Sequence, residues 1–209
     1  MRVREYGQVV GSHGSRRRIT NGGFRGLTLV ALVIAGGGCG EALPVLRLPM
    51  PEGNSVVVAQ DNAPYDHPIS FGGMPLCLTG EGTVTITAVG IHEVSGDIRI
   101  EAFALRPNPF VRGLDGVGLI HKSLVEIGGG FDPGSTQQVG AMCPTETQMA
   151  DGSAEPLDEF AVQVSWSAGE LAGGRGLDVT YSVEGVERTS VLPYGIWLCS
   201  SACPDDLGP

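Results

Sequence analysis

Residues 177–192 read Leu-Asp-Val-Thr-Tyr-Ser-Val-Glu-Gly-Val-Glu-Arg-Thr-Ser-Val-Leu, and this stretch gives the clearest indication of the fold. In Leu177–Val183 apolar and polar side chains alternate one by one, which is typical of a strand with one buried face. The pair Glu184-Gly185 is a tight-turn signal because glycine adopts positive φ without a steric penalty. A second run, Val186–Leu192, follows directly. The stretch therefore predicts an antiparallel hairpin.

Similar alternation recurs along most of the chain, and no stretch keeps a helical period for more than a turn or two. Between residues 108 and 147 the sequence is glycine-rich, and only short apolar pieces there indicate strands. The further predicted strands are Ser55–Gln60, Val84–Val94, Ile98–Leu105, Phe160–Ser167 and Tyr194–Cys199, with one or two short strands among apolar pieces such as Gly118–Ile120 and Leu124–Ile127.

Short strands separated by turn signals, with no helices between them, favour an all-β fold. We predict an antiparallel immunoglobulin-like β-sandwich, with a small β-barrel as the alternative. Residues 55–203 are long enough for a single domain with a sizeable core, and residues 204–209 would form a short tail. Trp166 and Trp197 are expected in the core of this domain.

The amino terminus has the pattern of an export signal. Residues 1–38 contain six arginines against one glutamate, Glu5. The arginines precede an uncharged apolar run, Leu27–Ala35. As a helix, nine such residues would span about 13 Å, whereas the hydrocarbon core of a bilayer is about 30 Å thick. We therefore predict that residues 1–38 are a signal peptide and not a permanent membrane helix.

The small residues Ala35, Gly36, Gly37 and Gly38 lead directly into Cys39. This segment resembles the lipobox of bacterial lipoprotein signal peptides, although Gly36 occupies the position where that family usually has leucine. The resemblance implies that Cys39 receives a diacylglycerol and that the chain is cut just before it. The protein would then be anchored to the outer face of the cell membrane by lipid. The alternative is an ordinary secretory signal and a secreted product.

Residues 39–54 contain Pro44, Pro49 and Pro51 and show no periodicity. Such a composition is typical of a spacer. We therefore predict a Pro-rich tether between the lipidated Cys39 and the folded domain.

The charge of the exported part limits its partners. Removing six arginines and one glutamate with residues 1–38 takes the net charge from −10 to −15. Nucleic acids and anionic lipid headgroups both require a basic surface, so neither is expected as an electrostatic partner. The predicted partners are the membrane, through the lipid at Cys39, and an envelope protein or a glycan.

Without Cys39, the chain has an even set of cysteines: Cys77, Cys143, Cys199 and Cys203. In an exported protein such a set predicts two disulfides. Three pairings are open at this point. Either pairing that joins Cys199 to Cys77 or Cys143 would tie the carboxyl terminus to the body of the domain.

The segment Cys199-Ser200-Ser201-Ala202-Cys203-Pro204 resembles the Cys-x-x-x-Cys-Pro motif of Sco-type copper chaperones and thiol oxidoreductases. Two thiols at this spacing bind Cu(I) or cycle through a disulfide. The resemblance implies a redox or copper-handling role for Cys199 and Cys203, which is the alternative function. In that family a thioredoxin-like domain follows the motif, whereas five residues follow Pro204 here.

Other site patterns are weak. The histidines His67, His92 and His121 lack metal-site spacing, and His92 is expected to be an ordinary hydrogen-bonded residue. Four acids could hold calcium through their oxygens, but a solvated acidic loop is favoured; these acids are Asp151, Glu155, Asp158 and Glu159. No catalytic motif is present, and we predict no catalytic residue, no metal and no cofactor.

The sequence therefore predicts a non-enzymatic lipoprotein of the cell envelope with a binding or structural role. The exported part resembles small uncharacterised lipoproteins of GC-rich bacteria. They share a Gly-Leu-x-Val-x-Tyr strand, here Gly176–Tyr181, and a terminal Leu-Cys, here Leu198-Cys199. The Thr-rich strand faces and the loops after Asn108 are the candidate contact surfaces.

Overall fold

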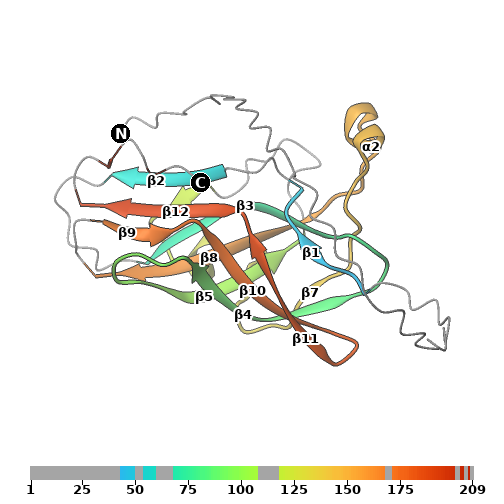
Figure 1. Cartoon of the computed structure of the whole chain (residues 1–209), viewed down its shortest axis with the longest axis horizontal. Helices are drawn as coiled ribbons and strands as arrows, with labels where there is room; N and C mark the ends of the chain where they lie inside the picture. The colour runs from blue at the N-terminus through green and yellow to red at the C-terminus, as the bar shows by residue number, and fades with distance from the viewer. Residues whose placement is uncertain are drawn as a thin grey trace, which may run out of the picture. The chain divides into compact units, whose positions relative to one another are not determined.

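Strands account for most of the regular structure in the computed structural model (Figure 1). The structure describes residues 43–49, 54–59, 68–107, 118–167, 171–200, 203, 204 and 207. The strands among them are β1 (Leu46–Arg47), β2 (Asn54–Ala59), β3 (Ile69–Leu78), β4 (Val84–His92), β5 (Ile98–Arg106), β6 (Leu119–Ile120), β7 (Gln137–Val139), β8 (Asp158–Trp166), β9 (Leu171–Gly174), β10 (Gly176–Val183), β11 (Val186–Leu192) and β12 (Tyr194–Cys199). The helices are α1 (Leu124–Ile127) and α2 (Glu146–Asp151).

The described strands form three sheets. The first has the order β1-β3-β8-β5, with β6 added to β3. The second has the order β11-β10-β4-β7, and the third β2-β12-β9. Neighbouring strands are antiparallel except β2 and β12, which are parallel. The edges of these sheets stay open, so the described residues form no closed barrel and the small-barrel alternative was wrong.

The main core contains buried residues of all three sheets. It includes Phe71 of β3, Phe160 of β8 and Tyr181 of β10, none of which is more than 1% exposed. Trp166 and Trp197 are 8% and 7% exposed, as expected of core residues. Burial of alternate residues on facing sheets confirms the all-β sandwich class.

The hairpin predicted for residues 177–192 is confirmed in register. Leu177 pairs with Leu192 and Val183 with Val186, and seven residue pairs join β10 to β11. Glu184 and Gly185 have φ values of 52° and 79°. Positive φ at both central residues is what a two-residue type I′ turn requires, and its twist matches that of the strands.

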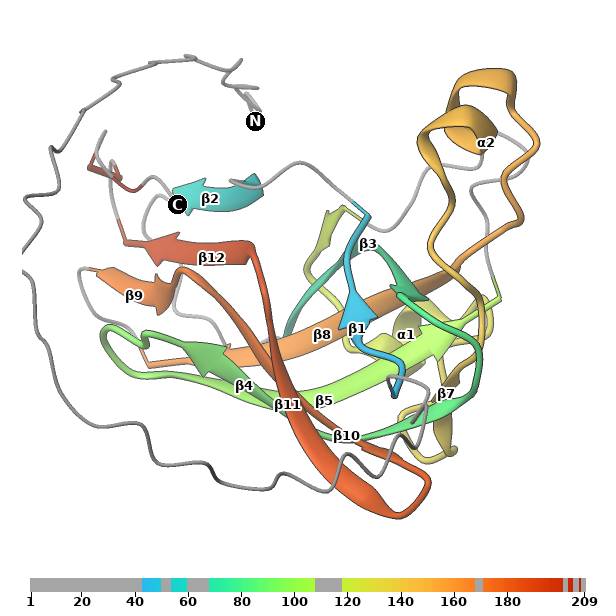
Figure 2. The same cartoon turned by 45° about the vertical axis from the view of Figure 1, so that its right-hand side comes forward.

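The same two-stranded ribbon continues from the second sheet into the third. β9 leads into β10 through Arg175, and β11 leads into β12 through Pro193 (Figure 2). β9 pairs with β12 in the same antiparallel sense. At this bend a Cβ on Gly176 would lie only 2.7 Å from the carbonyl oxygen of Leu192. Glycine is needed there because the two backbones approach too closely for a side chain.

The folded part begins earlier than predicted. The described part of the expected tether, residues 43–49, contains β1, which pairs with Leu78 and Cys77 of β3. Leu46 is 1% exposed and belongs to the main core. The tether boundary at residue 54 was therefore wrong, because proline and glycine content hid a short apolar strand.

Strand β3 was missed by the sequence analysis, although it is buried along most of its length. Gly72, Gly73 and Pro75 interrupt its alternation. The pairing with β8 shifts register between Phe71 and Met74, and this bulge accommodates the glycines. Turn-forming residues inside a central strand therefore mark a bulge here and not a loop.

Two short helices also differ from the prediction. Leu124–Ile127, one of the two candidate short strands, forms α1, whose capping box joins Ser123 and Glu126. α2 was not predicted, and a second capping box joins Thr145 and Gln148. In each helix these side chains satisfy amide groups that the first turn leaves without partners. The apolar runs were too short for their period to show this.

Several predictions lie outside the described residues. These are the signal peptide 1–38, Cys39, His67, residues 108–117 and most of the tail 204–209. In the described part of the chain, no helix is long and apolar enough to cross a membrane.

Candidate functional site

The four cysteines form two disulfides, Cys77–Cys143 and Cys199–Cys203. Neither pairing that would tie the carboxyl terminus to the body of the domain is present. Cys77–Cys143 spans 66 positions of sequence. Cys77 lies directly before Leu78 and Cys143 directly after Met142, and Leu78 and Met142 form a β-bridge. Cys199–Cys203 spans only four positions at the end of β12. Two disulfides are typical of a protein in an oxidising, exported compartment.

The predicted solvated acidic loop is wrong for Glu159, whose side chain is fully buried. Its Oε2 accepts a hydrogen bond from Nε of Arg106 at 2.6 Å and lies 2.5 Å from Nη2 of the same residue in an ion pair. Its Oε1 accepts one from the amide of Gly73 at 2.7 Å. The guanidinium also lies 4.5 Å from the ring centre of Phe131. A charged pair so fully satisfied holds structure together and offers nothing to a ligand.

The other three acids do not gather around a common point. Asp151 and Glu155 are exposed, and Asp158 is partly buried, which raises the pKa of its carboxyl. Among the described residues no group of three or more metal-ligating side chains is close enough to hold an ion.

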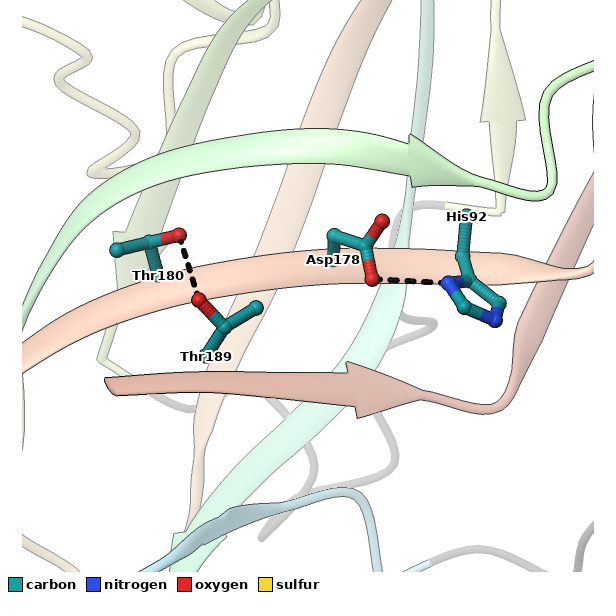
Figure 3. Close-up of polar contacts among 4 residues, drawn as sticks. All are labelled: His92, Asp178, Thr180 and Thr189. Carbon is teal, nitrogen blue, oxygen red and sulfur yellow. Dashed lines mark hydrogen bonds and ion pairs between the residues drawn. The ribbon is translucent and has the colours of Figure 1, made fainter.

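His92 makes the hydrogen bond that the sequence analysis expected. Its Nδ1 donates to Oδ1 of Asp178 at 2.9 Å, from the end of β4 to β10 (Figure 3). The two side chains are 34% and 41% exposed. His121 is exposed in the loop before α1 and lies away from this pair in the sequence.

The His92–Asp178 pair belongs to the outer surface of the second sheet. On β10 the inward residues Val179 and Tyr181 are buried, so Asp178, Thr180 and Ser182 point outward. The outward side chains of this sheet are short and mostly polar, although the exposed Val191 of β11 lies opposite Asp178. We call this set the polar face: Thr85 and His92 of β4, Asp178, Thr180 and Ser182 of β10, and Glu187 and Thr189 of β11.

Hydroxyl groups are paired across the polar face. Oγ1 of Thr180 lies 3.1 Å from Oγ1 of Thr189 on the neighbouring strand (Figure 3). Asp178 and Thr180 are opposite Gly90 and Ala88 of β4, which have almost no side chain. A Cβ on Gly90 would meet nothing within 4 Å. The face is therefore open beside Asp178, and a ligand can reach the carboxylate there.

Two grooves open on the described surface. One, of about 440 Å³, lies between β1 and β11 and is lined by Leu46, Leu48 and Leu192, with Arg47 as its one titratable side chain. The other, of about 380 Å³, lies between β4 and β5 and includes Thr87, Ala88 and Glu101. The second groove likewise has one titratable side chain in its lining, Glu101.

The polar face could be anticipated only in part. The alternation in β4 and β10 predicted outward threonines, but nothing in the sequence indicated that Thr189 would meet Thr180 or that His92 would meet Asp178. No family of proteins matches the chain, no curated protein is similar to it in sequence, and no solved structure matches its fold.

Proposed function

We propose that this protein is a non-enzymatic lipoprotein of the bacterial cell envelope that binds a glycan through its polar face. Export removes residues 1–38, lipid on Cys39 anchors the chain to the outer face of the cell membrane, and the sandwich presents the face to the envelope polymer. The observation that carries the proposal is the open row of hydroxyl, carboxylate and imidazole groups on β4, β10 and β11.

The chemistry of the polar face suits a polyhydroxylated ligand. A threonine hydroxyl both donates and accepts hydrogen bonds, as sugar hydroxyls do, and a carboxylate accepts from two hydroxyls at once. The hydrogen bond from His92 fixes the orientation of Asp178. Gly90 and Ala88 leave room for a sugar ring to lie against the sheet. Such contacts are individually weak, so binding would depend on many anchored copies acting on one polymer.

In the sequence, the described part of the domain begins close to the proposed anchor. Only residues 40–42 separate Cys39 from Leu43, the first described residue. A fully extended chain over this distance spans at most about 14 Å. With lipid on Cys39, the sandwich would therefore work near the membrane surface.

Sedimentation with purified peptidoglycan sacculi tests the glycan proposal. We expect the wild-type protein to sediment with sacculi and the Asp178→Ala/Thr189→Ala variant to remain in solution. The matched control is Glu81→Ala/Thr83→Ala, which removes one acid and one threonine from exposed positions outside the polar face. Equal sedimentation of both variants, or none of the wild type, would overturn the assignment of the polar face.

Metabolic labelling with a radioactive fatty acid tests the anchor. The wild-type chain should carry label and Cys39→Ala should not. Label that is unchanged in the variant, or absent from both, would contradict lipidation at Cys39. A secreted, unlabelled protein that still sediments with sacculi would support the glycan proposal and contradict the lipid anchor.

The alternative function, redox or copper handling, has one supporting observation: Cys199 and Cys203 are bonded to each other and not to the other cysteines. Reduction by a dithiol reductant would deliver two electrons and two protons to this disulfide, leaving two thiols and an oxidised reductant. The thiolates could then bind Cu(I).

Titration of the reduced protein with Cu(I) against a chromogenic chelator tests this alternative. Copper handling requires one equivalent bound by the wild type and none by Cys199→Ser/Cys203→Ser, with Cys77→Ser/Cys143→Ser as the control. Equal binding by both double variants would exclude these two thiols as a copper site.

A further inference from the structure

The segment around α2 stands away from the three sheets in both views of the molecule (Figures 1 and 2). We call residues 141–157 the α2 finger. None of the six residues of α2 is buried, and Met142 and Met149 are 51% and 52% exposed. Burial resumes only at Leu157, just before β8. The core of the sandwich therefore does not account for the conformation of the finger.

The base of the α2 finger is fixed to β3. The disulfide Cys77–Cys143 joins them, and two backbone hydrogen bonds flank it. The amide of Cys143 donates to the carbonyl of Leu78 at 2.8 Å, and the amide of Leu78 donates to that of Ala141 at 2.9 Å. The finger is thus positioned covalently against the first sheet.

The helix itself is held by local polar contacts. Oγ1 of Thr145 accepts from the amide of Gln148 at 3.2 Å, and Oε1 of Gln148 accepts from the amide of Thr145 at 2.9 Å. Gly152 ends the helix in the left-handed conformation. A six-residue helix is not stable by itself in water, so these contacts and the disulfide preorganise it. Preorganisation reduces the entropy lost when a partner binds.

The surface of the α2 finger combines exposed thioethers with negative charge. Glu146, Asp151 and Glu155 are exposed, and no lysine or arginine occurs in the sequence between Lys122 and Arg175. The hydroxyl and amide of Ser153 donate hydrogen bonds to Asp151, which lowers the pKa of its carboxyl and keeps it charged. Methionine side chains adapt to irregular apolar pockets and are common at binding surfaces. The complementary partner is therefore cationic around an apolar pocket.

We propose that the α2 finger is a docking element for a basic protein surface, which receives Met149 in an apolar pocket and surrounds it with lysine or arginine side chains. This site is separate from the polar face and goes beyond the glycan function proposed for that face. The two can fail independently, because no residue is shared between them.

Site-specific photocrosslinking in the living cell tests the docking element. A photoreactive residue replaces Ala150 in the full-length chain, and a matched one replaces Val125 of α1, which is 71% exposed. We expect a discrete adduct from position 150 only, joined to a protein segment rich in lysine and arginine. No adduct at position 150, an adduct with a glycan, or equal adducts from both positions would overturn the proposal.

Charge reversal sharpens the same experiment. Glu146→Lys/Glu155→Lys should lower the yield of the adduct at position 150 by at least about tenfold, because like charges then face each other across the interface. Glu81→Lys/Glu184→Lys makes the same change of net charge at exposed positions elsewhere and should leave the yield unchanged. Equal losses in the two variants would show that only net charge matters and would overturn the finger as a specific site. Identical thermal unfolding of both variants verifies that folding is intact.

Discussion

The β10–β11 ribbon and the irregular region 118–157 are stabilised in different ways. The ribbon pairs with itself over a short stretch of chain, through a turn at Glu184-Gly185 and regular alternation. The irregular region depends on distant partners. The side chain of Gln137 accepts from the amide of Leu105, and that of Gln163 accepts from the amide of Leu124. A regular alternation of apolar and polar side chains is thus enough to form the ribbon. The conformation of the irregular region depends instead on particular polar groups and one disulfide.

The largest loss of stability is expected from breaking the buried ion pair beside the irregular region. Arg106→Met leaves the carboxylate of Glu159 buried without its cation, which costs about 3–5 kcal/mol. The measurement is the free energy of unfolding from urea denaturation. Arg99→Met is the control, because its ion pair with Asp97 is exposed and screened by solvent. Equal losses in the two variants would show that burial of Glu159 does not matter.

The two disulfides should differ in their effect on unfolding. In the chain-entropy description, a crosslink over 66 positions stabilises by about 4 kcal/mol and one over four positions by about 2 kcal/mol. Cys77→Ser/Cys143→Ser should therefore lower the urea midpoint more than Cys199→Ser/Cys203→Ser. The opposite order would show that the irregular region is held without its disulfide.

The same contrast explains what the sequence could and could not predict. The hairpin and the strands beginning at Val84, Ile98 and Phe160 were correct because side-chain alternation is a local property. Glu159 was misread as a loop acid because its partner, Arg106, lies 53 positions away. The disulfide pairing depends equally on distant contacts, and three pairings fitted the sequence. For the polar face, the sequence predicted outward threonines on β4 and β10. It did not predict that His92 would contact Asp178 or that Thr189 would contact Thr180.

A smaller effect is expected at the turn of the ribbon. Gly185 has φ of 79°, so Gly185→Ala should cost about 1–2 kcal/mol because a Cβ is strained in the left-handed region. Gly90→Ala is the control for stability, because its Cβ would meet nothing within 4 Å. Thermal unfolding distinguishes the two variants. In addition, Gly90→Ala should weaken sedimentation with sacculi by partly filling the space beside Asp178, whereas Gly185→Ala should not.

The smallest effect concerns pH at the junction of the ordered strand and the finger. Burial raises the pKa of Asp158, the first residue of β8, above its ordinary value of 3.8. The folded state thus binds the proton more tightly than the unfolded state, so this group stabilises the fold below about pH 4 and loses that contribution as the pH rises through the raised pKa. The pKa of Asp151, in the α2 finger, is lowered instead, because Ser153 donates hydrogen bonds to its carboxylate.

Asp158→Asn should consequently have a higher melting temperature than the wild type at pH 7. The difference between the two melting temperatures should be smaller at pH 3. Asp151→Asn has the opposite sign, since its carboxylate stabilises the fold above its ordinary pKa and loses that effect as the pH falls through the lowered value. Melting curves of both variants between pH 3 and pH 7 test the pair. A melting temperature of Asp158→Asn that falls at pH 7 would mean that the charged carboxylate is stabilised at the base of the finger, and that β8 is not closed to water at its first residue.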